Sequence, residues 1–409
     1  MFMMKRKMFM ALLVGFVGAS FAYAEDELPV ENESATAKAW HVNSDTDAPE
    51  PAGWGTAPLN KAIENSMMKT VKGDDGEEMK VGRKVTKWIS APKFGGYVIG
   101  SYKYSSAEGK KSGDGFGLRL IRLYVDGTIL KDFNYRLQIE TKGTTHVKDA
   151  FIEWAHWKEF KVKIGQFKRA FTFENPYNPW DVGVGDYSQL VKKLAGFGDY
   201  CGTADGADFK GSNGGRDIGL QFQGDLFPIG KDGHRLIHYQ AAIYNGQGIN
   251  AADKNSQKDL IGTIQFQPIK DLYIGAFGWT GRYNVNGKTV NRDRYGFGVK
   301  YEHDGWSARA EYAHHSGGKG EVANGMGRAD AWYATVGVPC TPWLKIYAKY
   351  DAYREGTWST MNSIYSIAPN IQLHKNLMFQ LQYNFVNKRL GMAGHENYHE
   401  AWVETYVRF

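Results

Sequence analysis

The sequence has 409 residues, a formal net charge of +6, 14% aromatic residues and 23% charged residues. This aromatic content and small net charge exclude a disordered chain, and two cysteines exclude a disulfide-stapled scaffold. After the first two dozen residues, no apolar run approaches the ~18 residues that a membrane-spanning helix needs.

Residues 1–24 have the pattern of a secretory signal peptide. Basic residues at 5–7 precede an apolar stretch at 8–21, and Ala-Tyr-Ala at 22–24 forms a small-x-small cleavage site. The segment is too short for a single-pass anchor, which is the alternative interpretation. We therefore expect an exported chain whose mature form begins at Glu25.

Residues 25–92 form an acidic segment with 13 acidic and 8 basic residues and little alternation. Pro-Glu-Pro at 49–51 and Gly-Asp-Asp-Gly at 73–76 interrupt it. This composition predicts a mostly irregular, acidic leader, with at most one short helix at 59–71.

From residue 93 to residue 409 the chain changes to short runs in which apolar and polar residues alternate. Phe133, Tyr135, Leu137 and Ile139, for example, alternate with Asn, Arg, Gln and Glu. This period of two predicts β-strands with one apolar face. We expect sixteen strands, at 94–104, 116–127, 133–141, 147–155, 160–167, 217–224, 236–244, 260–266, 272–283, 293–301, 306–313, 331–338, 343–351, 363–373, 377–385 and 401–409.

The connections between these strands alternate between long and short, and the third long connection has 49 residues, 168–216. A soluble sandwich has no reason for this asymmetry, whereas an outer-membrane barrel has short periplasmic turns and long external loops. The sequence therefore predicts an all-β protein, a transmembrane antiparallel β-barrel of sixteen strands. Its last strand ends on Phe409 and resembles the C-terminal signature that the outer-membrane assembly machinery recognises.

Four stretches carry a family resemblance. Residues 116–128 form an Arg-rich second strand with a Gly-Thr turn, and residues 147–153 contain Lys-Asp-Ala-Phe. Residues 163–174 contain Gly-Gln-Phe-Lys followed by Phe-Thr-Phe-Glu, and residues 215–219 read Gly-Arg-Asp-Ile-Gly. These motifs resemble those of the phosphate-selective porin O and P family.

The resemblance implies a trimeric sixteen-stranded barrel that passes small anions, with the long third loop folded into the lumen. An external flap is the alternative for that loop. The chain departs from the family inside it: Val-Lys-Lys-Leu at 191–194 replaces the usual acidic-Arg-Ser element. The resemblance thus leaves the preferred solute open.

The predicted function is a passive, water-filled outer-membrane channel for small hydrophilic solutes, with a mild preference for anions such as phosphate. The alternatives are an exported all-β carbohydrate-binding protein and a structural outer-membrane barrel serving as adhesin or scaffold. Expected partners are small solutes, outer-membrane lipid, the assembly machinery and two further copies in a homotrimer. Because acids and bases are interleaved in an exported chain, we expect no nucleic acid.

The alternation of side chains between the two faces of each strand selects the candidate pore-lining and anion-binding residues. If the apolar residues of a strand face lipid, the basic residues between them face the lumen. An alternative role for these bases is to pair with inward acids and hold the wall together. The candidates are Arg122, Arg136, Lys161, Lys163, Lys192, Lys193, Arg294, Lys300, Arg309, Lys345 and Lys349.

Other motifs carry no predicted chemistry. His-Glu-Asn-Tyr-His at 395–399 matches a zinc-protease pattern, but it precedes a strand, and the protease chemistry needs a helix. We assign it, and His314-His315, to loops. No nucleophile elbow, phosphate-binding loop or cysteine cluster is present, so we expect no enzyme activity, cofactor or metal site. Cys201 and Cys340 are expected to remain unpaired.

Overall fold

The structure is a computed structural model that describes residues 70–72, 78–80, 92–107, 114–143, 145–197, 214–253, 256–285, 288–317, 327–356 and 360–409. The predicted signal peptide, most of the predicted leader and Cys201 lie outside these residues. Within the leader, β1 (Thr70–Lys72) pairs antiparallel with β2 (Glu78–Lys80). The short helix predicted at 59–71 is therefore wrong at its last two residues, and the rest of it lies outside the described residues.

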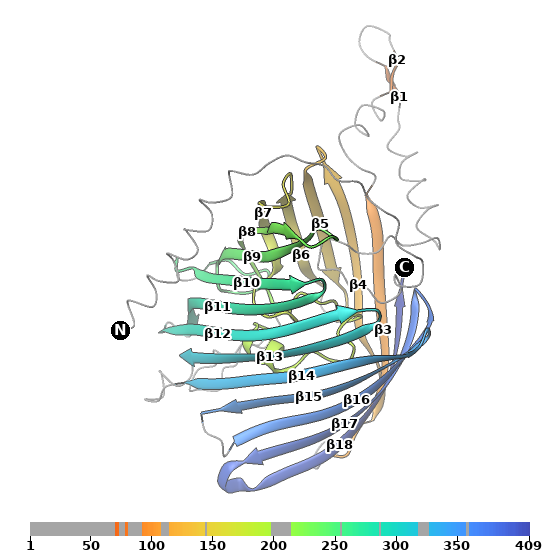
Figure 1. The fold of residues 1–409 in the computed structure, drawn as a ribbon, viewed down its shortest axis with the longest axis vertical. Helices are drawn as coiled ribbons and strands as arrows, with labels where there is room; N and C mark the ends of the chain where they lie inside the picture. The colour runs from red at the N-terminus through yellow and green to blue at the C-terminus, as the bar shows by residue number, and fades with distance from the viewer. Residues whose placement is uncertain are drawn as a thin grey trace.

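Sixteen further strands form one closed antiparallel barrel in which every strand pairs with its neighbours in the chain (Figure 1). The predicted all-β antiparallel barrel and its number of strands are confirmed. The strands are β3 (Lys93–Ser105), β4 (Gly115–Ile129), β5 (Phe133–Glu140), β6 (His146–Trp154), β7 (Lys161–Lys168), β8 (Arg216–Ile229), β9 (His234–Tyr244), β10 (Asp259–Ile269), β11 (Leu272–Val285), β12 (Lys288–His303), β13 (Trp306–Gly317), β14 (Arg328–Thr341), β15 (Leu344–Glu355), β16 (Thr360–His374), β17 (Leu377–Leu390) and β18 (His395–Arg408).

The two ends of the barrel sequence meet. β18 pairs with β3 along nine residues of each strand, from Glu400↔Ser105 to Arg408↔Tyr97. Phe409 and Gly96 then exchange two backbone hydrogen bonds of 3.0 Å each. Closure pairs the backbone groups that an open sheet edge would leave without hydrogen bonds. Such unpaired groups are too costly inside a bilayer.

Exposure alternates along the strands as the sequence predicts. On β12, Phe297 exposes 56% of its surface while Arg294 is buried, and on β7, Ile164 exposes 59% while Lys163 is buried. Leu137 and Leu381, both expected to face lipid, expose 47% and 45%. The barrel therefore turns its apolar residues outward and its polar residues inward, which is the arrangement that a hydrocarbon exterior requires.

Several strands extend further toward the long connections than the sequence indicates. Two assignments to loops are wrong: His314 and His315 lie in β13, and residues 395–399 begin β18. Cross-strand pairs such as Tyr295↔His314 and Phe385↔His399 continue the ladder there. The reason is that backbone hydrogen bonds extend a ladder even after the apolar alternation ends.

The third long connection leaves 47 residues between β7 and β8. It contains the short helix α4 (Gln189–Leu194). Ser188 caps this helix, because its Oγ accepts a hydrogen bond of 3.2 Å from the Val191 amide. Among the described residues, no helix has the length and hydropathy needed to cross a bilayer.

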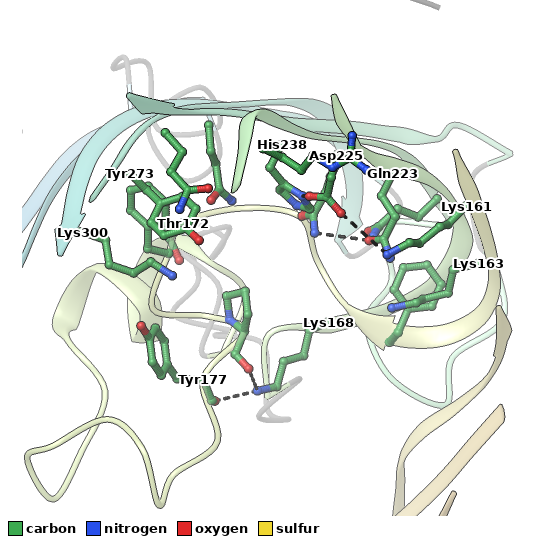
Figure 2. Close-up of a pocket in the computed structure, with 18 of the residues that line it drawn as sticks. Lys161, Lys163, Lys168, Thr172, Tyr177, Gln223, Asp225, His238, Tyr273 and Lys300 are labelled. Carbon is green, nitrogen blue, oxygen red and sulfur yellow. Dashed lines mark hydrogen bonds and ion pairs between the residues drawn. The ribbon is translucent and has the colours of Figure 1, made fainter. Parts of the chain in front are cut away.

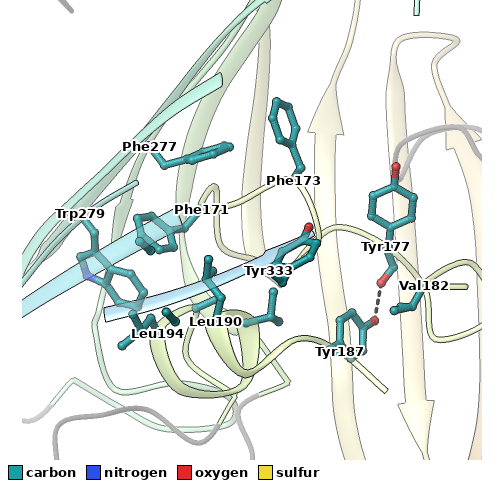
Figure 3. Packing of buried hydrophobic residues seen from close by; sticks show 14 of the residues in the cluster. Phe171, Phe173, Tyr177, Val182, Tyr187, Leu190, Leu194, Phe277, Trp279 and Tyr333 are labelled. Atoms are coloured by element: carbon teal, nitrogen blue, oxygen red, sulfur yellow. Dashed lines mark hydrogen bonds between the residues drawn. The ribbon is translucent and has the colours of Figure 1, made fainter. Parts of the chain in front are cut away.

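A hydrophobic cluster fixes this connection against the barrel (Figure 3). Phe171, Leu190 and Leu194 of the connection are completely buried. They belong to one cluster with Trp279 of β11 and Tyr333 of β14. The main apolar core of the chain therefore lies between the third connection and the strand wall.

Candidate functional site

The third connection is hydrogen-bonded to strands on the far side of the barrel from its own ends. Glu311 of β13 accepts hydrogen bonds from the backbone amides of Phe173 and Glu174, at 2.7 and 3.0 Å. Asp351 of β15 accepts two from the Gln189 amide, at 2.9 and 3.1 Å. In a ring of sixteen strands, β15 lies eight positions from β7, which is the opposite wall.

Uncharged and basic side chains complete this attachment. Asn370 of β16 and Gln380 of β17 each donate to the carbonyl oxygen of Gly183 at 3.0 Å. Arg309 of β13 donates to the carbonyl oxygen of Val182 at 2.5 Å. Four strands thus hold the backbone of the connection by directional contacts in addition to the apolar cluster.

A cavity of about 540 Å³ lies between the start of the connection and the concave face of β5 to β12 (Figure 2). Its lining is polar with an excess of positive charge. Its acidic side chains are Asp149, Asp225, Asp232, Asp271 and Glu302. Its basic side chains, histidine aside, are Arg136, Lys161, Lys163, Lys168, Arg169, Arg235, Lys270 and Lys300.

Four of the predicted site residues meet at this cavity: Arg136, Lys161, Lys163 and Lys300. Lys161 lies 3.7 Å from a carboxylate oxygen of Asp225. The Nζ of Lys163 lies 3.3 Å from Glu153. Arg136 is more firmly paired, because its guanidinium donates two hydrogen bonds to Asp126 at 2.8 and 2.9 Å.

Lys300 has a different environment from the other three. Its ammonium lies 4.5 Å from the ring centre of Tyr273, 5.7 Å from that of Phe173 and 5.9 Å from that of Tyr177. Among the described residues, no carboxylate oxygen lies within ion-pair distance of it. Lys300 therefore presents a charge that aromatic faces stabilise and that makes no direct ion pair among the described residues.

Three other candidates hold the third connection rather than line the cavity. Arg309 contacts Val182 as described, and Arg294 donates to the carbonyl oxygen of Leu194 at 2.8 Å. The Nζ of Lys349 lies 3.8 Å from Glu174 and 3.7 Å from Asp351. Their positive charges are used in fixing the connection.

The remaining candidates lie elsewhere. Arg122 pairs with Glu140 at 2.9 Å and donates to the Tyr97 hydroxyl at 2.8 Å. The ammonium of Lys345 lies over the ring of Tyr347. Lys192 pairs with Asp186, and Lys193 lies 5.7 Å from the ring centre of Tyr353. The structure does not bring these residues into the cavity.

Two aspartates of the connection have opposite electrostatic environments. Burial disfavours the charged form of Asp186, but the nearby Lys192 and Arg119 outweigh burial and lower its pKa to about 2. The Arg119 guanidinium, from β4, lies 3.8 Å away. Burial dominates at Asp181 and raises its pKa to about 6, against the opposing effect of Arg408.

The sequence analysis missed several charged groups of the cavity. Lys168 and Arg169 lie where β7 ends, and Lys270 lies in the two-residue turn between β10 and β11. His234 and His238 of β9 also line the cavity, each paired with an aspartate. The alternation of side chains assigns faces only within strands, so it cannot place residues in turns. Lys168, however, is the last residue of the Gly-Gln-Phe-Lys motif and could have been identified from it.

That motif has a structural role. Gly165 has a φ of +128°, and a Cβ there would lie 2.2 Å from the Ala150 carbonyl oxygen, so only glycine fits. The next residue, Gln166, donates to the carbonyl oxygens of Val147 and Lys148 at 2.8 and 3.0 Å. Its own oxygen accepts from the Asn250 amide at 2.7 Å. The motif therefore joins β6, β7 and the connection between β9 and β10.

The zinc-protease pattern lies on an extended strand. In β18 successive side chains point to opposite faces, so Glu396 lies on the face opposite to His395 and His399. The described residues contain no group of three or more His, Cys, Asp or Glu placed to hold a metal ion. Cys340 is an exposed free thiol.

Comparison with known proteins agrees with the barrel geometry. No curated protein sequence matches the chain. Among solved structures, the anion-selective porin from Comamonas acidovorans superposes with a TM-score of 0.60 at 14% identity, over 78% of this chain and 100% of that one. The outer membrane channel DcaP of Acinetobacter baumannii gives 0.55 at 11% identity, over 79% and 98%. OmpT of Vibrio cholerae in its trimer form, an outer membrane protein, gives 0.52 at 12%, over 78% and 99%.

These superpositions establish the fold, and a family model shows a similarity in sequence as well. The model of the phosphate-selective porins O and P matches residues 95–271, which run from β3 to the turn after β10 and include all four motifs. The predicted resemblance to the phosphate-selective porin O and P family is thereby confirmed over this part of the chain, and the family match and the barrel fold together support an outer-membrane porin channel.

Proposed function

We propose that this porin is a passive channel for small hydrophilic solutes with a mild preference for anions such as phosphate. The observation that carries the proposal is the cavity lining, in which eight Lys and Arg side chains face five Asp and Glu side chains. Transport of this kind requires no catalytic step and no cofactor.

The preference follows from the field of these charges. A narrow polar passage with low-dielectric walls focuses a small excess of positive charge on passing ions. Most of the cations are paired with carboxylates, so their charge is largely balanced; Lys300 is the exception described above. We expect a weak preference that declines as salt shortens the screening length, about 10 Å at 0.1 M.

Reversal potentials across a planar bilayer in a salt gradient test the preference. Lys161→Glu combined with Lys300→Glu should move the selectivity toward cations, because both residues line the cavity. Lys142→Glu is the matched control, since Lys142 is exposed in the connection between β5 and β6. An unchanged reversal potential in a double variant that still conducts would end the proposal.

We also propose that the third connection lies across the lumen and sets the width of the pore. Its hydrogen bonds to Glu311 and Asp351, on strands far from its ends, support this role, as does its buried cluster. Asp351→Ala with Asn370→Ala removes two attachment points and should increase single-channel conductance. A conductance equal to that of the parent channel would favour the external flap.

The chain is further proposed to form a homotrimer with its exposed apolar face against lipid, and to carry residues 25–92 on the periplasmic side. The trimer form of OmpT, which has the same fold, supports the first point. Mass measurement of the detergent-solubilised protein before and after heating tests it, and a monomer mass in the unheated sample contradicts it.

A further inference from the structure

Five glutamines line one side of the cavity, on three adjacent strands. Gln221 and Gln223 belong to β8, Gln240 belongs to β9, and Gln265 and Gln267 belong to β10. A site for simple anions needs only hydrogen-bond donors. A carboxamide offers two N–H donors and an acceptor oxygen, so this row can bind groups that both donate and accept, such as hydroxyls.

Part of the row is already ordered by its own hydrogen bonds. Gln221 donates to Gln223 at 2.6 Å, Gln240 donates to Gln223 at 3.3 Å, and Gln223 donates to Glu153 at 2.6 Å. Each amide nitrogen carries two hydrogens, so Gln221 and Gln240 each retain a donor. The side chain of Gln265 makes no hydrogen bond to any of the described residues.

Positive charge lies on both flanks of this row. Lys161 lies on β7, before the first glutamine strand, and Lys300 lies on β12, two strands beyond the last. Figure 2 shows the two lysines on opposite sides of the cavity. The aromatic faces of Tyr177 and Tyr273 lie beside Lys300, where they can pack against the C–H groups of a carbon skeleton.

We propose that this cavity binds polyhydroxylated organic anions, with the anionic group at Lys300 and the hydroxyls on the carboxamide row. The proposal rests on the channel function above and names the class of solute that the channel favours. An inorganic anion without hydroxyl groups, such as chloride, uses the lysines but not the acceptor oxygens, and a neutral sugar does not use the charge of Lys300. An anionic group attached to a polyol uses both sets of groups, as in a sugar acid or a sugar phosphate.

Block of chloride current through single channels tests this. Glucuronate and glucose 6-phosphate carry both features, acetate carries only the charge, and glucose carries only the hydroxyls. We expect the half-blocking concentration of glucuronate to be at least about tenfold lower than those of acetate and glucose, since several hydrogen bonds add to one charge. Equal block by acetate and glucuronate would overturn the proposal. Block by glucose 6-phosphate but not by glucuronate would restrict the site to phosphate esters and would disprove the binding of sugar acids.

Variants assign the block to the residues. Lys300→Met should raise the half-blocking concentration of glucuronate about tenfold. Gln240→Leu with Gln265→Leu should remove the advantage of glucuronate over acetate. Gln257→Leu, in the exposed connection before β10, is the control that should change neither. Glucuronate block that survives both cavity variants would contradict the assignment.

The test separates this inference from the channel proposal. Reversal potentials in potassium chloride, measured without organic solutes, report on anion preference alone. An anion-selective channel that does not discriminate among the probes disproves only the inference. If the protein does not conduct, calorimetric titration of the intact detergent-solubilised protein with glucuronate and acetate still decides whether the site exists, with no preference for glucuronate overturning it.

Discussion

Arg216 and Asp149 form a buried, two-pronged ion pair. The Arg216 Nε lies 2.7 Å from Oδ1 of Asp149, and its Nη2 lies 2.8 Å from Oδ2. Only 2% and 6% of the two side chains are exposed. One residue belongs to the Lys-Asp-Ala-Phe motif on β6 and the other to the Gly-Arg-Asp-Ile-Gly motif that begins β8. The pair therefore spans β7 and fixes the start of β8, where the third connection ends, to β6.

Removing one partner of this pair should be costly. Asp149→Ala leaves the Arg216 guanidinium buried without its carboxylate, and such a change destabilises by about 3–5 kcal/mol. Asp126→Ala, which breaks the more exposed pair with Arg136, should cost about 1 kcal/mol or less. Urea titration of the heat-modifiable folded form measures both. Equal losses in the two variants would contradict the role of the buried pair.

Gly165 should not tolerate a side chain. In Gly165→Ala the new Cβ meets the Ala150 carbonyl oxygen in a backbone conformation that alanine rarely adopts. We expect a large loss of folded barrel in refolding yields measured by gel mobility. Gly100→Ala is the control, because a Cβ at Gly100 has no atom within 4 Å. A refolding yield for Gly165→Ala equal to that of Gly100→Ala would disprove the steric argument.

A charged side chain on the outward face of β17 should destabilise the barrel. Leu381 is exposed on the outside of the barrel, and an arginine near the bilayer midplane costs about 2–4 kcal/mol. Leu381→Arg should therefore lower stability in the urea titration. Gln240→Arg places the same residue on the cavity side and should cost less. The assignment of faces fails if the two variants rank in the opposite order.

The strands could be predicted from the sequence because their alternation is a local property. A barrel strand such as β17 has lipid on one side and polar groups on the other, so residues 377–385 already indicate the strand. The ends could not be predicted. Residues 386–389 and 395–398 pair with each other beyond the apolar pattern, through backbone hydrogen bonds that any side chain permits.

The candidate site was predictable only in part. The alternation along β7 places Lys161 and Lys163 on the polar face, and both line the cavity, because that placement depends on their own strand. Partners depend on packing between distant segments. The contact of Glu311 with the backbone of residues 173–174 spans more than 130 positions, so no local pattern shows that the base beside it, Arg309, is used to hold the connection.

Asp181 and Asp186 provide a pH-dependent prediction with opposite signs. The folded pKa of Asp181, about 6, is above its usual value, so its ionisation destabilises the fold as pH rises from about 4 to 6. The folded pKa of Asp186, about 2, is below its usual value, so its charge stabilises the fold above about pH 4, and this contribution is lost as pH falls toward 2.

At pH 8, Asp181→Asn should therefore raise the temperature at which the folded form converts on heating, whereas Asp186→Asn should lower it. At pH 4 the gain from Asp181→Asn should nearly vanish, because the parent carboxyl is already protonated, while most of the loss from Asp186→Asn should remain. Each variant serves as the isosteric control for the other. Shifts of the same sign at pH 8 would show that charge at these positions does not govern the stability of the third connection.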